Sequence, residues 1–121
     1  MYLTTRAPSG QIVKAGIDGS NPVVLVGNLD DPSGIFVDND SSRVLWTDYN
    51  ADKIQSSYLN GTDVRDIIQL PRGSEPIGTV VYRERIYWAN WATVQSCNRA
   101  GQDVQTLYTA TDIICQMALV T

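Results

Sequence analysis

The fold of this chain is decided by residues 32–68, which read PSGIFVDNDSSRVLWTDYNADKIQSSYLNGTDVRDII. Three short words of this stretch, PSGIFV, LWTD and IQSSYLNGT, recur in the same order elsewhere in the chain. The other copies lie at 76–81 and, degraded, at 115–120 for the first word, at 87–90 for the second, and at 12–20 and 94–102 for the third. Gly19, Gly61 and Gly101 hold the same position in the three copies of the third word and lie 42 and then 40 residues apart, which gives the period of the repeat. The chain is therefore a repeat protein.

Each repeat is predicted to contain four β-strands. Every word is short, rich in β-branched or aromatic residues, and ended by Gly, Asp, Asn or Pro. A fourth apolar run follows the glycine, at 23–26, 64–68 and 104–108. The pairs Asp18-Gly19 and Asn60-Gly61 are typical of two-residue hairpin turns. No segment has a sustained helical period, so the predicted fold class is all-β.

A period of about 40 to 45 residues with four strands is typical of a β-propeller blade. We therefore expect one domain, residues 1–121, built of four-stranded antiparallel blades. The alternative is a β-sandwich or an open meander, which the repeat spacing and the hairpin pairs favour less.

The repeated words resemble the YWTD, or class B, repeats of the low-density-lipoprotein receptor family, which also occur in nidogen and the epidermal growth factor precursor. The resemblance covers nearly the whole chain and is strongest over residues 32–68. Three departures stand at the ends of the match. Residues 2–5, YLTT, lack the Trp and Asp of the word; Ala89 and Asn90 replace its Thr and Asp; and the third repeat lacks the Pro-x-Gly corner.

The resemblance implies a ring of six blades, whereas this chain supplies strands for three. Propellers have about four to eight blades, so three cannot close a ring. We expect three strands within 2–26, four within 33–69, four within 76–109, and a terminal strand at 115–121 that completes the first blade of a partner. The prediction is a homodimer that forms one six-bladed ring by strand exchange; the alternative is a fragment of a longer propeller. The residues expected to pair across the two chains are Tyr2, Leu3, Thr4, Gln116, Met117, Ala118, Leu119 and Val120.

Composition excludes several classes of function. The 121 residues include no histidine, so Ser-His-Asp triads, Cys-His pairs and HExxH zinc sites are impossible. Lys and Arg number 9 against 13 Asp and Glu, and the resulting net charge of −4 argues against a nucleic-acid partner. No run of about eighteen apolar residues is present to span a membrane. We expect no catalytic residue, no cofactor and no metal site.

Six residues are expected to be structural: Trp46, Trp88, Asp48, Asn90, Gly34 and Gly78. The resemblance implies that the tryptophans hold neighbouring blades together. It also implies that Asp48 and Asn90, which end the same strand, accept hydrogen bonds from nearby backbone. The two glycines belong to the Pro-x-Gly word.

One face of the ring is expected to bind a protein or peptide. Residues just after the second strand, and those just before the first, enter loops on the same face. The resemblance implies protein ligands there, and large exposed aromatic side chains are typical binding anchors. The alternative is that these are ordinary solvated loop residues. The candidates are Tyr49, Trp91, Asn50, Asp52, Arg6, Asp30, Asp31, Arg72 and Glu75.

Three further features have two interpretations each. The acidic run 38–41 resembles a calcium loop but lacks the Gly and distal Glu of an EF-hand, so a hairpin turn is favoured. Asn39 and Asn60 lie in glycosylation sequons at predicted turns, where they also satisfy turn chemistry. Cys97 and Cys115 are expected to be buried thiols, with a bridge between neighbouring blades as the alternative.

The predicted function is a non-enzymatic, extracellular, receptor-like module that binds a protein or peptide. One alternative is a self-assembling structural scaffold. The other is a propeller enzyme with a metal held by carboxylates, because other propeller families place such sites at the central channel.

Overall fold

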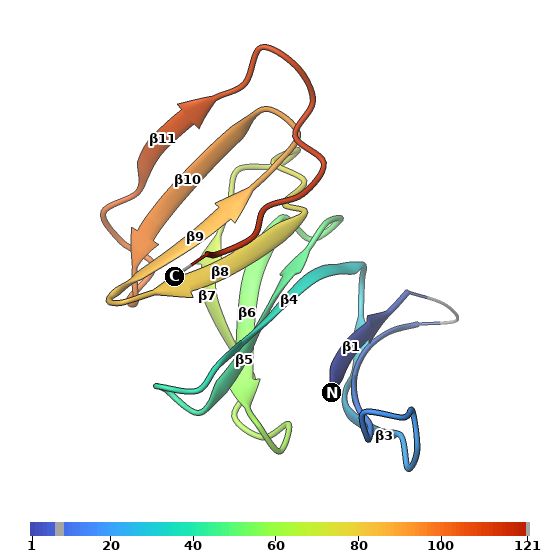
Figure 1. The fold of residues 1–121 in the computed structure, drawn as a ribbon. Coiled ribbons are helices and arrows are strands. Elements are labelled where there is room, and N and C mark those ends of the chain that lie inside the picture. Colours follow the sequence, from blue (N-terminus) through green and yellow to red (C-terminus); the bar gives the residue numbers. More distant parts are fainter. Residues whose placement is uncertain (7–8, 121) are drawn as a thin grey trace.

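Within residues 1–6 and 9–120, which the computed structural model describes, eleven β-strands form three antiparallel sheets that stand in a row (Figure 1). The first sheet contains β1 (Tyr2–Thr5), β2 (Gly10–Lys14) and β3 (Val23–Leu29). The second contains β4 (Pro32–Asp38), β5 (Arg43–Asp48), β6 (Lys53–Tyr58) and β7 (Arg65–Gln69). The third contains β8 (Gly78–Tyr82), β9 (Arg85–Ala89), β10 (Thr93–Asn98) and β11 (Gln105–Thr109).

The all-β prediction is confirmed, and each sheet is one blade with its strands in sequence order. The Pro-x-Gly words form β4 and β8, the YWTD words form β5 and β9, and the third words form β2, β6 and β10. The first blade has three strands, since β1 pairs with β2 and, within the described residues, with no other strand.

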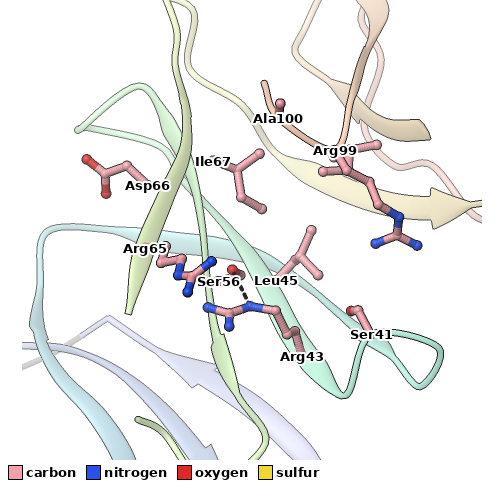
Figure 2. A pocket seen from close by; sticks show the side chains of 10 residues that line it. Ser41, Arg43, Leu45, Ser56, Arg65, Asp66, Ile67, Arg99 and Ala100 are labelled. Atoms are coloured by element: carbon pink, nitrogen blue, oxygen red, sulfur yellow. Dashed lines mark hydrogen bonds between the residues drawn. The ribbon is translucent and has the colours of Figure 1, made fainter. Parts of the chain in front are cut away.

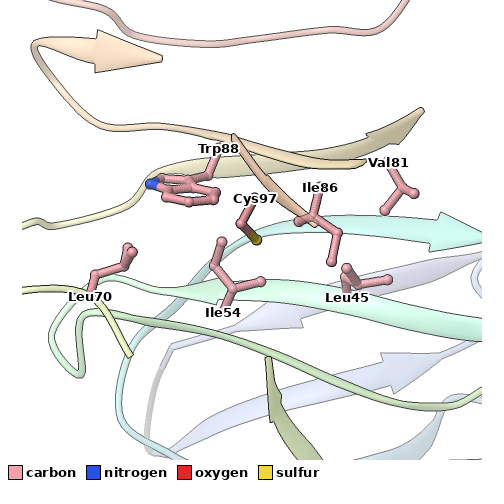
Figure 3. Packing of buried hydrophobic residues seen from close by; sticks show 7 residues of the cluster. All are labelled: Leu45, Ile54, Leu70, Val81, Ile86, Trp88 and Cys97. Atoms are coloured by element: carbon pink, nitrogen blue, oxygen red, sulfur yellow. The ribbon is translucent and has the colours of Figure 1, made fainter. Parts of the chain in front are cut away.

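The core consists of two apolar clusters, one in each seam between neighbouring blades. In β5, Val44 and Trp46 face the first blade, whereas Leu45 faces the third. This alternation follows from the two-residue period of a strand. It explains why the strand is apolar on both faces, since the middle blade has a neighbour on each side. Figure 3 shows the second seam, where Trp88 and Cys97 lie over Ile54 and other apolar side chains of the middle blade.

The Pro-x-Gly words bring two backbones into contact at the inner edges of the blades. A Cβ added to Gly34 would lie 2.5 Å from the Cα of Gly78, so only glycine fits at position 34. Beside it, the Ser33 hydroxyl donates a hydrogen bond of 2.8 Å to the Pro76 carbonyl. β4 and β8 therefore meet edge to edge where the ring axis would run.

The C-terminal segment does not form the expected strand in the single chain. Residues 115–120 are irregular, and Thr121 lies outside the described residues. After β11 the chain turns back, with the Ile114 N–H donating to the Trp91 carbonyl at 2.7 Å. Cys115, Gln116 and Met117 then line a cavity of about 300 Å³ beside the inner edges of β4 and β8. Pairing of this segment with a partner blade stays a prediction.

Candidate functional site

Tyr49, Glu75 and Trp91 form a connected cluster on the expected binding face. Tyr49 follows β5, Trp91 follows β9, and Glu75 lies in the loop that leads to β8. The Tyr49 hydroxyl donates to Glu75 Oε2 at 2.6 Å, and Trp91 Nε1 donates to the Tyr49 hydroxyl at 3.0 Å and to Glu75 Oε2 at 3.2 Å. The two rings meet edge to face, with centroids 6.0 Å apart. The cluster joins the second and third blades across their seam.

The carboxylate of Glu75 accepts hydrogen bonds from both aromatic side chains of this cluster. The hydrogen bond to Glu75 raises the pKa of Tyr49, and the hydrogen bond from Trp91 only partly opposes this effect. The tyrosine hydroxyl therefore stays protonated as a donor at neutral pH. Trp91 remains 41% exposed.

Buried Asp52 holds the loop that carries Glu75. Its carboxylate accepts the Gly73 N–H at 2.9 Å and the Glu75 N–H at 2.7 Å. Glu75 itself has a φ of 53°, a left-handed conformation that is uncommon for a residue with a side chain. These two hydrogen bonds fix the backbone that places the Glu75 carboxylate within hydrogen-bond reach of the Tyr49 hydroxyl and Trp91 Nε1.

Asp31 has a similar supporting role in the neighbouring loop. It is buried, its carboxylate pairs with the exposed Arg6 guanidinium, and its carbonyl accepts the Tyr49 N–H at 2.8 Å. The hydrogen bond to Asp31 raises the pKa of Arg6. The Asp31 N–H in turn donates to Asp48 Oδ1 at 3.0 Å.

The nine predicted binding residues thus fall into three groups. Arg6, Asp30, Asn50, Arg72 and Trp91 are exposed, Tyr49 and Glu75 are half-buried, and Asp31 and Asp52 are buried. The structure brings Tyr49, Glu75 and Trp91 together. We assign the two buried aspartates to the support of the loops, because their carboxylates are already engaged by the chain.

The predicted structural residues lie in the blades. Trp46 and Trp88 are fully buried, and Trp46 Nε1 donates to Gln55 Oε1 at 3.1 Å. Asp48 Oδ1 accepts the Ala51 N–H at 3.0 Å. Asn90 Oδ1 accepts the Ala92 N–H at 2.9 Å and the Thr93 N–H at 2.8 Å. The Asp48 and Asn90 side chains therefore close the loops that follow the second strands.

The acidic run 38–41 forms the β4–β5 turn, and its first carboxylate is engaged. Burial alone would raise the pKa of Asp38, but hydrogen bonds from Ser41 and Arg99 outweigh it and hold the pKa below its usual value. Arg99 Nη1 lies 2.9 Å from Asp38 Oδ2 and joins the third blade to the second. In the described part of the chain no group of three acidic, histidine or cysteine residues is placed to hold a metal.

A cavity of about 360 Å³ opens at the seam between the second and third blades (Figure 2). Arg43, Arg65 and Arg99 line it, and their guanidinium groups already pair with Asp63, Asp63 and Asp38. We therefore interpret this cavity as the edge of the seam, lined by side chains that already form ion pairs.

One repeated motif was missed in the sequence. Arg43 binds the Ser56 hydroxyl at 2.9 Å and Asp63 at 3.0 Å. In the next blade, Arg85 binds Ser96 at 3.1 Å and Asp103 at 2.9 Å. The signal was the recurrence of Arg, Ser and Asp at 42, 40 and 40 residues. The motif ties the second strand to the third strand and to the turn before the fourth.

The two cysteines are free and lie in different environments. Cys97 is buried in the second seam, as expected, whereas Cys115 is exposed, contrary to the expectation of a buried thiol. Among the described residues, no helix is long and apolar enough to cross a membrane.

Comparison with known proteins decides the family. No protein-family model matches the chain. A vitellogenin receptor of Solenopsis invicta is 33% identical over 115 residues, 88% of this chain. The human low-density lipoprotein receptor-related protein 5 is 33% identical over 94 residues, 76% of this chain. The chain belongs to the YWTD-repeat β-propeller family.

The structural match of this YWTD propeller chain agrees with the sequence match. A chain of a crystallised nidogen and laminin complex superposes with a TM-score of 0.80, covers 91% of this chain at 24% identity, and is itself covered to 44%. The chain spans 6% of the vitellogenin receptor and 6% of the human protein. More distant propellers include a streptogramin B lyase, with a TM-score of 0.55, so the architecture also carries enzymes.

Proposed function

We propose that this YWTD propeller chain is a non-enzymatic, extracellular module that binds a protein or peptide through the face carrying Tyr49, Glu75 and Trp91. The observation that carries the proposal is the exposed Trp91 ring, held in place by hydrogen bonds to Tyr49 and Glu75. Two relatives are named as receptors or receptor-related proteins, which supports a binding role.

The chemistry of the face favours a mixed apolar and cationic partner segment. Trp91 offers a large ring whose orientation is already fixed, so little conformational entropy is lost on binding. The loops of this face carry Asp30 and Glu75 beside Arg6 and Arg72, so the sign of the long-range field comes from the whole chain, whose net charge is −4. Long-range attraction by this net charge favours the approach of a basic peptide.

We further propose that two copies form one six-bladed ring. The support is the first blade, whose β1 pairs with β2 and with no other strand in the described part of the chain. The segment after β11 is irregular but lies beside the inner edges of β4 and β8, close to where an additional inner strand would lie. In the proposed homodimer this segment completes the partner's first blade.

The test of the binding face is selection of peptides from a random phage-displayed library on the immobilised chain, followed by titration of the selected peptides. Trp91→Ala is expected to weaken them by about tenfold or more, as truncation of a central aromatic anchor does. Tyr82→Ala is the matched control, since Tyr82 is also 41% exposed but lies at the β8–β9 turn.

Peptides that bind Trp91→Ala as well as they bind the unchanged chain would overturn the proposed face. Failure to select any peptide, with the chain folded, would favour the scaffold alternative and would also contradict the proposal.

A further inference from the structure

Two N-glycosylation sequons lie in turns of the second blade, at the end away from the proposed binding face. Residues 39–41 belong to the β4–β5 turn, and residues 60–62 belong to the β6–β7 turn. β5 begins at this end with Arg43, and Tyr49 follows its other end. Since Tyr58, the last residue of β6, pairs with Arg43, the β6–β7 turn lies at the same end of the blade. A group attached at either turn would leave the binding face uncovered.

The Asn60 side chain keeps its amide nitrogen free. Its Oδ1 accepts the Thr62 N–H at 3.1 Å and the Thr62 hydroxyl at 2.6 Å. A backbone N–H can only donate, so the carboxamide atom that it meets is the oxygen. Within residues 1–6 and 9–120, Nδ2 of Asn60 has no hydrogen-bond partner, and the residue is exposed. The atom that an N-linked sugar requires is therefore free and at the surface.

The two contacts between Asn60 and Thr62 are local. They span two residues, and short polar side chains form such turns without help from the rest of the fold. The hydroxyl of the third sequon residue can therefore stand beside the asparagine before the blades assemble. An Asn-x-Thr sequon is recognised through these two side chains together.

The sequon at Asn39 lacks this arrangement. The Ser41 hydroxyl donates to Asp38 Oδ2 at 2.6 Å, and the same carboxylate pairs with Arg99. The hydroxyl of this sequon is thus committed to a carboxylate and not to the asparagine. In the unfolded chain Asp38 and Asp40 also flank Asn39 with negative charge, which repels the diphosphate of a lipid-linked sugar donor.

The fold keeps the position of Asn60 exposed in every blade. Asp18 and Ala100 hold the corresponding place before the turn glycine, and both are exposed, as Asn60 is. The turn itself is anchored, because a Cβ added to Gly61 would lie 2.4 Å from the Leu25 carbonyl oxygen of the first blade. A bulky group on Asn60 is therefore held by a fixed turn and has access to solvent.

We infer that Asn60 carries an N-linked oligosaccharide, at the end of the second blade that lies away from the binding face. In this step Nδ2 of Asn60 forms a bond to the anomeric carbon of a lipid-diphosphate-linked oligosaccharide. The bond from that carbon to the diphosphate oxygen breaks, the lipid diphosphate leaves with the electron pair, and one Nδ2 proton passes to a base of the transferase. The inference rests on the proposed extracellular role, since a sequon is an acceptor in secreted chains.

The first experiment measures the mass of the full chain after secretion from cultured insect cells behind a cleavable leader. Intact mass spectrometry is expected to show one oligosaccharide, which peptide N-glycosidase removes. The glycosidase converts the linked asparagine to aspartate, so treatment in heavy-oxygen water labels the site, and peptide mapping assigns the label to Asn60 or Asn39. A sample kept in the same water without the enzyme corrects for spontaneous deamidation of the Asn60-Gly61 pair.

Matched variants keep the turn and remove one part of the sequon. Asn60→Asp is expected to lose the oligosaccharide and to retain the turn, because Asp18 accepts the Ser20 N–H at 3.0 Å in the same turn of the first blade. Thr62→Ala is also expected to lose the oligosaccharide, whereas Thr62→Ser, which keeps the hydroxyl, should retain it. Asn39→Asp is the control at the other sequon and should leave the mass of the attached sugar unchanged.

The outcomes separate this inference from the proposed function. A secreted, folded chain with an unmodified Asn60 would overturn the inference, and so would an oligosaccharide on Asn39 alone. Peptide titration compares the glycosylated chain with Asn60→Asp, and equal affinities are expected because Asn60 and Tyr49 lie at opposite ends of the second blade. Weaker binding by the glycosylated chain would overturn the placement of the sugar away from the binding face. Failure of both chains to bind any peptide would contradict the proposed function and leave the sugar on Asn60 standing.

Discussion

Burial in a seam sets the reactivity of a single thiol. Desolvation in the second seam raises the pKa of Cys97 to about 11, so this thiol stays protonated and unreactive near neutral pH. Cys115 is exposed on the segment after β11.

We expect a thiol reagent at pH 8 to modify one cysteine of the folded chain quickly and the second only after unfolding in denaturant. Mass spectrometry of the digested protein identifies the modified residue. Equal rates at both positions in the folded chain would contradict the described packing of Cys97.

A second prediction at this scale concerns Asp38, whose pKa is lowered in the folded chain by Ser41 and Arg99 although its burial opposes the shift. A lowered pKa contributes stability that is present above the unfolded-state value of about 3.9 and is lost as the pH falls through the lower folded-state value. Asp38→Asn is therefore expected to reduce the free energy of unfolding at pH 7 by about 1–3 kcal/mol and to have a smaller effect near pH 3. Urea unfolding at both values measures this.

The control for that comparison is Asp40→Asn, an exposed position in the same turn. An equal loss of stability for the two variants at pH 7 would show that the Arg99 contact contributes nothing beyond the general charge of the turn.

At the scale of elements, the spacing between the second and third blades is set by the close contact of β4 with β8 at Gly34. A methyl group at position 34 would overlap the Gly78 backbone, whereas no atom of residues 1–6 and 9–120 lies within 4 Å of one added at position 78. We expect Gly34→Ala to cost about 1–3 kcal/mol of stability, because the inner strands must move apart. Gly78→Ala, its matched partner, should cost less than about 1 kcal/mol. Thermal unfolding of the two variants measures both, and equal costs would contradict the edge-to-edge contact of β4 and β8.

At the scale of the whole molecule, the proposed dimer makes stability depend on concentration. Association that favours the folded state raises the unfolding temperature as the chain becomes more concentrated. We expect Tm to rise between about 1 μM and about 100 μM for the unchanged chain. Scanning calorimetry or fluorimetry measures it, and a constant Tm for the unchanged chain would argue against an obligate dimer.

The sequence predicted the blades because each strand carries its own repeated word and its own turn. Gly61 belongs to a hairpin turn that requires a positive φ, and the YWTD word is rich in the β-branched and aromatic residues that favour a strand. Both signals can be seen in the sequence alone. The resemblance extended this to the order of strands and to the burial of Trp46 and Trp88.

The binding face was only partly predictable. Tyr49 and Trp91 follow a recognisable word, so their loop position was visible in the sequence. The burial of Asp31 and Asp52 was not, because it depends on which backbone N–H groups the folded loops present. The contact of Arg99 with Asp38 joins residues 61 positions apart and has no local signal.

Two turns that lean on the preceding blade give assembly a direction. A Cβ added to Gly61 would lie 2.4 Å from the Leu25 carbonyl oxygen, and one added to Gly101 would lie 2.1 Å from the Ile67 carbonyl oxygen. In both contacts the glycine belongs to the blade synthesised later, and the strand it rests on belongs to the blade that left the ribosome first. Each new blade therefore meets an outer strand that has already been synthesised, so the second and third blades can dock one after the other during translation.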